Sequence, residues 1–96
     1  MSPLTPRERR KLRARAHHLE PVARVGQAGI SPPVVDKIVS ELAIHELIKV
    51  KVGQGAPVPA KQAGPELAEA TGADLVQVIG RVVVLYKERP PEEDEG

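Results

Sequence analysis

The sequence contains no cysteine, tryptophan or phenylalanine, and Tyr86 is its only large aromatic residue. Without cysteine, the chain forms no disulfide bond and uses no thiolate chemistry. With one aromatic residue, it has no row of rings on which successive bases of a single strand could stack. These absences exclude a thiol enzyme and a disulfide-stabilised scaffold, and they argue against nucleic-acid recognition by aromatic stacking.

Long apolar runs are also missing. No stretch approaches the roughly 18 residues of a membrane span, and the basic N-terminal segment lacks the apolar centre of a signal peptide. We therefore expect a cytoplasmic monomer without contact to a membrane. A chain of 96 residues suffices for one small core, so we expect one domain over residues 1–89. The acidic residues 90–96 are expected to form a disordered tail.

Charge is distributed unevenly, although the net charge is only +1. The first 15 residues hold six basic side chains and a single acidic one, whereas residues 92–95 are all acidic. The basic residues are Arg7, Arg9, Arg10, Lys11, Arg13 and Arg15. Such a segment indicates a polyanionic partner. The alternative is an arginine-rich helix that is merely solvated.

Local signals predict three helices. Thr5, Pro6 and Glu8 form a capping box with proline in the first turn, so a helix should run from residue 6 to about residue 18. Ser31 should cap a second helix that ends near residue 44. Residues 61–71 have helical apolar spacing, which the Gly64-Pro65 pair interrupts.

Four segments have strand character. These are Pro21–Val25, Leu47–Val52, residues 75–79 and residues 82–86, and the last two should form a hairpin with Gly80 first in a type II′ turn. In the second segment the apolar side chains alternate with Lys49 and Lys51, which should lie on the face away from the core. The order α-β-α-β-α-β-β predicts an α/β fold, a two-layer sandwich around a four-stranded mixed sheet.

The loop between the first strand and the second helix is the strongest functional signal. It reads Gly26-Gln27-Ala28-Gly29, and a Gly-x-x-Gly loop brings bare backbone close to a partner. The helix that follows should direct free N–H groups and its positive dipole end towards the loop, which suits a phosphate. The alternative is an ordinary tight turn between a strand and a helix.

Several sequence blocks together resemble a known family. Residues 19–22, 25–30, 45–52, 71–73, 76–81 and 84–86 match, in order and spacing, a stand-alone CRM domain of the bacterial YhbY type. The resemblance covers about residues 7–87. It implies an RNA-binding protein with a fold like the C-terminal domain of translation initiation factor 3. It also implies association with precursors of the large ribosomal subunit.

We expect the first helix and the Gly-x-x-Gly loop to form one continuous RNA-binding face. The expected contacts are Gly26, Gln27, Ala28 and Gly29 in the loop, Arg7, Arg9, Arg10, Lys11, Arg13 and Arg15 in the helix, and Lys49 and Lys51 in the sheet. The partner would be ribosomal RNA of large-subunit precursors. The alternative is a protein-interaction module that docks on a ribosomal protein or a translation factor.

The sequence gives little support to enzymatic chemistry. His17, His18 and His45 are the only histidines, and none has a carboxylate or thiol at a convincing metal-ligand spacing. The pair His45-Glu46 falls where a helix passes into a strand, a usual place for polar residues. We therefore expect neither an enzyme nor a metal ion or other cofactor.

Overall fold

The computed structural model describes residues 4–89, so the acidic segment that we expect to be disordered lies outside the described residues. The elements follow the order α-β-α-β-α-β-β, as the sequence predicts. They are α1 (Pro6–Ala16), β1 (Pro21–Val25), α2 (Pro32–His45), β2 (Leu47–Val52), α3 (Ala60–Thr71), β3 (Asp74–Ile79) and β4 (Val82–Tyr86).

The four strands form one mixed sheet in the order β1-β2-β4-β3. The pair β1–β2 is parallel, whereas β2–β4 and β3–β4 are antiparallel. Strands β3 and β4 form the predicted hairpin, in which Ile79 pairs with Val82. Gly80 has a φ of 57°, and Arg81 does not share this positive φ, which is the combination that a type II′ turn needs.

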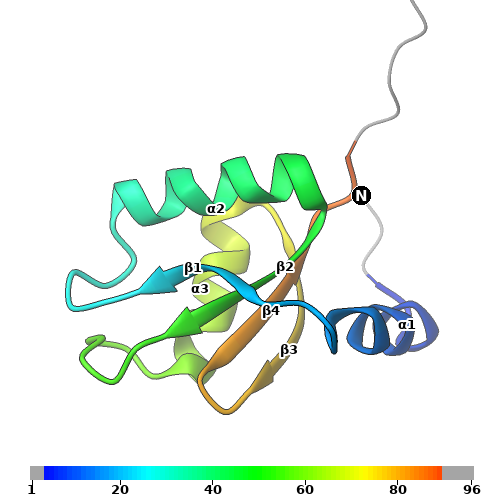
Figure 1. Cartoon of the computed structure of the whole chain (residues 1–96), viewed down its shortest axis with the longest axis horizontal. Coiled ribbons are helices and arrows are strands. Elements are labelled where there is room, and N and C mark those ends of the chain that lie inside the picture. Colours follow the sequence, from blue (N-terminus) through cyan, green and yellow to red (C-terminus); the bar gives the residue numbers. More distant parts are fainter. Residues whose placement is uncertain (1–3, 90–96) are drawn as a thin grey trace, which may run out of the picture.

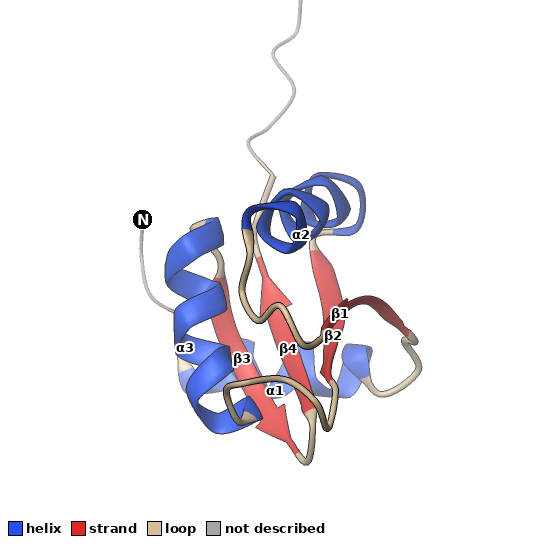
Figure 2. Ribbon diagram, turned by 90° about the vertical axis from the view of Figure 1, so that its left-hand side faces the viewer, coloured by secondary structure: helices blue, strands red, loops and turns tan. Residues whose placement is uncertain are grey.

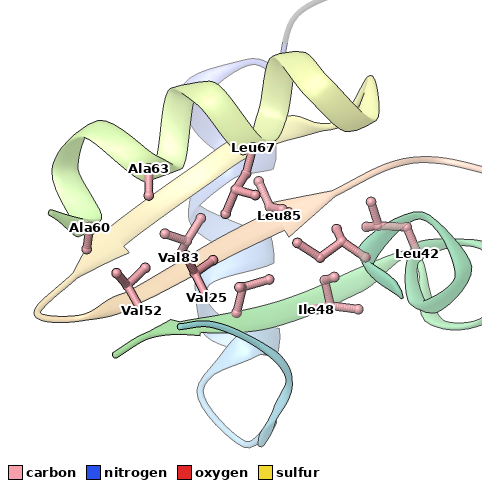
Figure 3. Close-up of a cluster of buried hydrophobic side chains, with 11 residues drawn as sticks. Val25, Leu42, Ile48, Val52, Ala60, Ala63, Leu67, Val83 and Leu85 are labelled. Atoms are coloured by element: carbon pink, nitrogen blue, oxygen red, sulfur yellow. The ribbon is translucent and has the colours of Figure 1, made fainter. Parts of the chain in front are cut away.

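Helices α2 and α3 cover one face of the sheet and enclose the main core. This core is entirely aliphatic (Figure 3), and Ile38, Leu67 and Leu85 are fully buried in it. Ile48, Val50 and Val52 of β2 point into the same core, while Lys51 between them is exposed. The predicted alternation of β2 is therefore confirmed.

Helix α1 packs on the opposite face of the sheet. Leu12 and Ala16 contact Leu47, Val76 and Val84 in a second, smaller cluster. Figure 2 shows α1 behind the strands, on the side away from α3. The two-layer sandwich of α2, α3 and the sheet therefore has a partial third layer. We call the remainder of this face, with Lys49, Lys51, Gln77 and Ile79, the open face.

Two helices differ in detail from their sequence predictions. The capping box of α1 is present, but the helix ends at Ala16 and not near residue 18. The chain forms a tight turn there, in which the N–H of Leu19 donates to the carbonyl of Ala16 at 3.0 Å. Helix α3 continues through the Gly64-Pro65 pair. A Cβ on Gly64 would lie 2.8 Å from a methyl group of Val78, so glycine at this position allows close packing of helix on sheet.

Candidate nucleic-acid interface

Residues 26–29, the glycine loop, form a tight turn. The N–H of Gly29 donates to the carbonyl of Gly26 at 3.0 Å, and the N–H of Ser31 donates to the carbonyl of Gly29 at 3.0 Å. Gln27 and Ala28 occupy the exposed tip of the turn. Within residues 4–89, the backbone amides of Gln27 and Ala28 have no hydrogen-bond partner. These two amides are therefore available to an oxygen atom of a ligand.

The two glycines of the loop differ in whether the fold requires glycine at their position. Gly29 has a φ of 73°, and a Cβ there would lie 3.0 Å from Cγ of Pro57. The fold itself therefore requires glycine at this position. Gly26 has no positive φ, and a Cβ there would meet nothing within 4 Å. The space beside Gly26 is open, so its bare backbone can be approached from outside.

The start of α2 offers fewer donors than the sequence analysis assumes. Pro32 and Pro33 occupy its first two positions and have no N–H, so within residues 4–89 only Val34 keeps an unused amide in the first turn. Ser31 stands at the capping position, but its side chain makes no capping hydrogen bond. The start of α2 can therefore offer a phosphate one backbone donor instead of the several that the sequence analysis assumes. The amides at the tip of the glycine loop remain as donors.

A second loop, residues 53–58, lies against the glycine loop. The N–H of Gly53 donates to the carbonyl of Val25 at 2.9 Å, and a Cβ on Gly55 would lie 3.2 Å from Cγ of Gln27. The amide oxygen of Gln54, when it faces the guanidinium of Arg81, accepts two hydrogen bonds at 3.0 Å. The two loops and the β3–β4 turn thus meet at one end of the sheet.

This end carries two cations that the sequence analysis missed, Arg24 and Arg81. The guanidinium of Arg24 lies over Gly53, where a Cβ would come within 2.9 Å of Nη2. Arg24 also pairs in register with Lys51 of the neighbouring strand. Arg81 follows Gly80 in the hairpin turn and is exposed. Arg81 belongs to the matching block 76–81 and Arg24 to none, but only the sheet order shows that both lie beside the glycine loop.

Lys49 and Lys51 connect the two ends of the open face. Lys49 lies beside Val84 in the sheet register, and Lys51 lies beside Val82. Lys51 is exposed, whereas Lys49 is half-buried near α1. In the part of the chain that the structure describes, neither lysine forms an ion pair.

Helix α1 and the glycine loop lie at opposite ends of the sheet (Figure 1). The five residues of β1, roughly 17 Å of extended chain, run between these two ends. Lys49, beside α1, and Lys51, beside Arg24, lie between the two. The one continuous RNA-binding face that the sequence analysis expects therefore stays a prediction.

The basic side chains of α1 also divide between two sides of the helix. Arg13 and His17 line a groove with Lys49, whereas Arg15 lines a separate depression with His45. Arg9 is half-buried, and its Nε has no hydrogen-bond partner in the part of the chain that the structure describes. Among residues 4–89, none of the six basic residues of α1 has an acidic partner within ion-pair distance. The placement of these residues therefore leaves their charges available to a ligand.

The polar residues at the end of α2 have structural partners. His45 lies 3.5 Å from Glu41, which also binds Lys37 at 2.7 Å. Glu46 accepts a hydrogen bond from the N–H of Arg89 at 2.8 Å, and this bond, with the charge of Arg89, lowers the pKa of the Glu46 carboxyl. Within residues 4–89, no three acidic, histidine or cysteine residues gather as metal ligands. No helix in these residues is both long and apolar enough to cross a bilayer.

The fold and this surface define a small α/β domain with a cationic sheet face beside a Gly-x-x-Gly loop. The chain belongs to the CRS1/YhbY (CRM) domain family, whose model matches residues 4–87. This result confirms the resemblance that the sequence blocks indicate.

Relatives of similar length are known from several bacteria. The chain is 39% identical over 85 residues to YqeI of Bacillus subtilis, named a probable RNA-binding protein, and covers 88% of each sequence. It is 42% identical over 94 residues to an RNA-binding protein of Haemophilus influenzae, covering 97% of this chain and 92% of the relative. The solution structure of a hypothetical Staphylococcus aureus protein superposes with a TM-score of 0.79 at 38% identity, over 94% of both chains.

Proposed function

We propose that this chain binds RNA through α1, the open face and the glycine loop, and that it assists assembly of the large ribosomal subunit. The observation that carries the proposal is the set of cations on α1 and the open face that have no acidic partner among residues 4–89. Membership of the CRM family and the names of the relatives support RNA as the polyanion.

The surface offers two kinds of phosphate contact. The amides of Gln27 and Ala28 are neutral donors that can bond a phosphate oxygen at short range. Lys51 and Arg24 act through charge at the same end of the sheet. At the other end, α1 supplies charge alone. RNA that engages both ends has to present phosphates to both, across a sheet whose strand β1 is roughly 17 Å long.

This spacing favours recognition of RNA shape. Tyr86, the only large aromatic residue, is half-buried beside the α1 cluster and is not on the open face. Phosphate contacts at fixed positions carry shape but little sequence information. Folded ribosomal RNA presents such shapes. The family resemblance points to precursors of the large subunit as the source of this RNA.

The dependence of RNA affinity on salt tests the electrostatic part of the proposal. If about five phosphates are neutralised, log affinity should fall against log salt with a slope of about −3.5 for a single strand or −4.5 for a duplex. The measurement is a fluorescence-anisotropy titration with a short ribosomal RNA hairpin at several salt concentrations. A slope near zero would refute binding by charge.

Gradient fractionation of a cell lysate tests the role in assembly. The protein should sediment with precursors of the large subunit and not with translating ribosomes. Sedimentation with the small subunit, or only with free protein at the top of the gradient, would contradict this role. Such a result would favour the protein-docking alternative.

A further inference from the structure

A groove lies between α1 and the open face of the sheet. Its wall on the helix side consists of Arg13, Ala14, Ala16 and His17, and its floor and far wall consist of Lys49, Gln77, Ile79 and Val84. The groove has a volume of about 420 Å³. That space is ample for one nucleobase with part of its ribose.

The floor of the groove follows a regular row across three strands. Lys49 pairs with Val84, and Val84 pairs with Gln77, so the three side chains lie side by side on one face of the sheet. From Lys49 to Gln77 the row covers two strand spacings, about 10 Å. Along this row the side chains are a cation (Lys49), an aliphatic group (Val84) and an amide (Gln77).

Ile79 extends the aliphatic part of this floor. It is 57% exposed, one of three large apolar side chains that stand in solvent among the described residues. This exposed side chain shares the groove with the cations Arg13 and Lys49 and the amide of Gln77, so it offers an apolar surface on which a flat ring can rest. The order of groups matches one nucleotide, with its phosphate beside the cations, its ring over Ile79 next to the nearly buried Val84, and its polar edge towards Gln77.

We propose that this groove binds a single unpaired nucleotide of the RNA, such as a bulged base next to a helix. The inference rests on the proposed function and deepens it, because it adds a site for a base to a surface that otherwise contacts phosphates. The amide of Gln77 offers a donor and an acceptor, which can bond the polar edge of a base. A fully paired helix has no base to offer this groove.

Two RNA hairpins with the same stem, one fully paired and one with a single unpaired uridine, test the inference. The unmodified protein should bind the bulged hairpin about fivefold more tightly, at the low end for base stacking because the floor is aliphatic. Ile79→Asp should abolish this preference. Ile44→Asp is the matched control, since Ile44 is 61% exposed on α2, on the other side of the sheet, and this variant should keep the preference.

Equal affinity of the unmodified protein for both hairpins would overturn the inference and leave the proposed function intact. A preference that persists in Ile79→Asp would also overturn it. Failure to bind either hairpin would instead refute the proposed function itself.

A second measurement does not depend on the folding of a variant. A 4-thiouridine at the bulge should crosslink, under ultraviolet light, to residues 13–17 or 77–79 of the unmodified protein. Crosslinks confined to residues 24–29 or 53–58 would show that the unpaired base lies at the other end of the sheet, and the inference would be wrong.

Discussion

The two faces of the sheet use their side chains differently. The face under α2 and α3 is sealed by aliphatic residues such as Leu67 and Val83, which are fully buried. The face that α1 covers in part has a smaller apolar cluster around Leu12, and beyond it the side chains are cationic or polar apart from the exposed Ile79. In β2 successive residues alternate between the two faces. One strand therefore contributes to both stability and the proposed RNA contact, through different residues.

Truncation of a residue on the sealed face should have the largest effect. Leu67→Ala should lower the free energy of unfolding by about 3 to 4 kcal/mol, because it leaves a cavity in the main core. Leu12→Ala on the other face should cost less, about 2 kcal/mol, because its cluster is smaller. Urea denaturation of both variants measures the difference.

RNA affinity should rank these two variants in the opposite order to stability: the less destabilised variant should lose more affinity. Folded Leu67→Ala should bind RNA like the unmodified protein, whereas Leu12→Ala should bind more weakly because α1 loses its anchor on the sheet. Equal RNA affinities of the two folded variants would contradict the assignment of RNA binding to the face that α1 covers in part.

Removal of charge from the open face should have the next largest effect. Lys49→Ala with Lys51→Ala should weaken RNA binding by about thirtyfold, or about 2 kcal/mol, since each charge-assisted contact contributes roughly 1 to 2 kcal/mol. The salt slope should become shallower by about 1.4 for a single strand or 1.8 for a duplex. Salt-titrated binding to the same RNA hairpin measures both quantities.

The matched control removes two cations from the segment after β4, away from the open face and the glycine loop. Lys87→Ala with Arg89→Ala has the same change in net charge and should leave the slope nearly unchanged, since Lys87 binds the carbonyl of Thr71 and Arg89 binds Glu46. If this control weakened binding as much as the open-face pair, net charge and not the position of the lysines would determine affinity.

The two glycines of the glycine loop should respond differently to the same substitution. Gly29→Ala should lower stability by about 1 to 2 kcal/mol, because its positive φ and the contact with Pro57 both oppose a side chain. Gly26→Ala should be within about 0.5 kcal/mol of the unmodified protein, since nothing crowds its Cβ position. Thermal denaturation measures both effects.

A larger residue at Gly26 tests whether RNA approaches the backbone there. Gly26→Leu should melt nearly as the unmodified protein does and bind RNA about fivefold more weakly, through steric exclusion of a phosphate contact. Unchanged affinity in such a stable variant would identify the loop as an ordinary structural turn.

Much of the fold follows from local sequence signals. The bounds of β1 and β2, the capping box at Thr5 and the turn at Gly80 depend on nearest neighbours, so the sequence predicts them. Helix α3 is harder to predict because Gly64 is explained by its contact with Val78, a residue of another element. The sequence also cannot tell which face of the sheet α1 covers, since its apolar stripe would fit either.

The candidate site was less predictable than the fold. The glycine loop and the lysines of β2 are visible in the sequence as residue types in a pattern. Arg24 and Arg81 become part of the surface only through the sheet order, which places the β3–β4 turn beside the loops. The loss of donors at the start of α2 could have been inferred, because Pro32 and Pro33 are plain in the sequence and proline has no N–H.

The smallest expected effect concerns Glu46, at the α1 end of the sheet. Glu46 joins the segment after β4 to the end of α2, since its carboxylate accepts from the N–H of Arg89 and its backbone carbonyl accepts from the N–H of Lys87 at 2.8 Å. The hydrogen bond from Arg89 and the charge of its guanidinium lower the pKa of Glu46 below the ordinary value of 4.5. The ionised carboxylate therefore stabilises the fold above that ordinary value, and the contribution is lost as the pH falls through the lowered pKa.

Glu46→Gln isolates this contribution because glutamine keeps the acceptor oxygen and removes only the charge. The variant should melt slightly below the unmodified protein at pH 7, and the two melting temperatures should converge as the pH falls below the lowered pKa of Glu46. Arg15 of α1 also lowers the pKa of Glu46 through its charge, so Arg15→Gln should reduce the same difference at pH 7. A melting difference that does not change with pH would mean that the Glu46 carboxylate acts by shape alone. In that case the charge of Arg15 would contribute nothing to folding at this end of the sheet and would be available entirely to RNA.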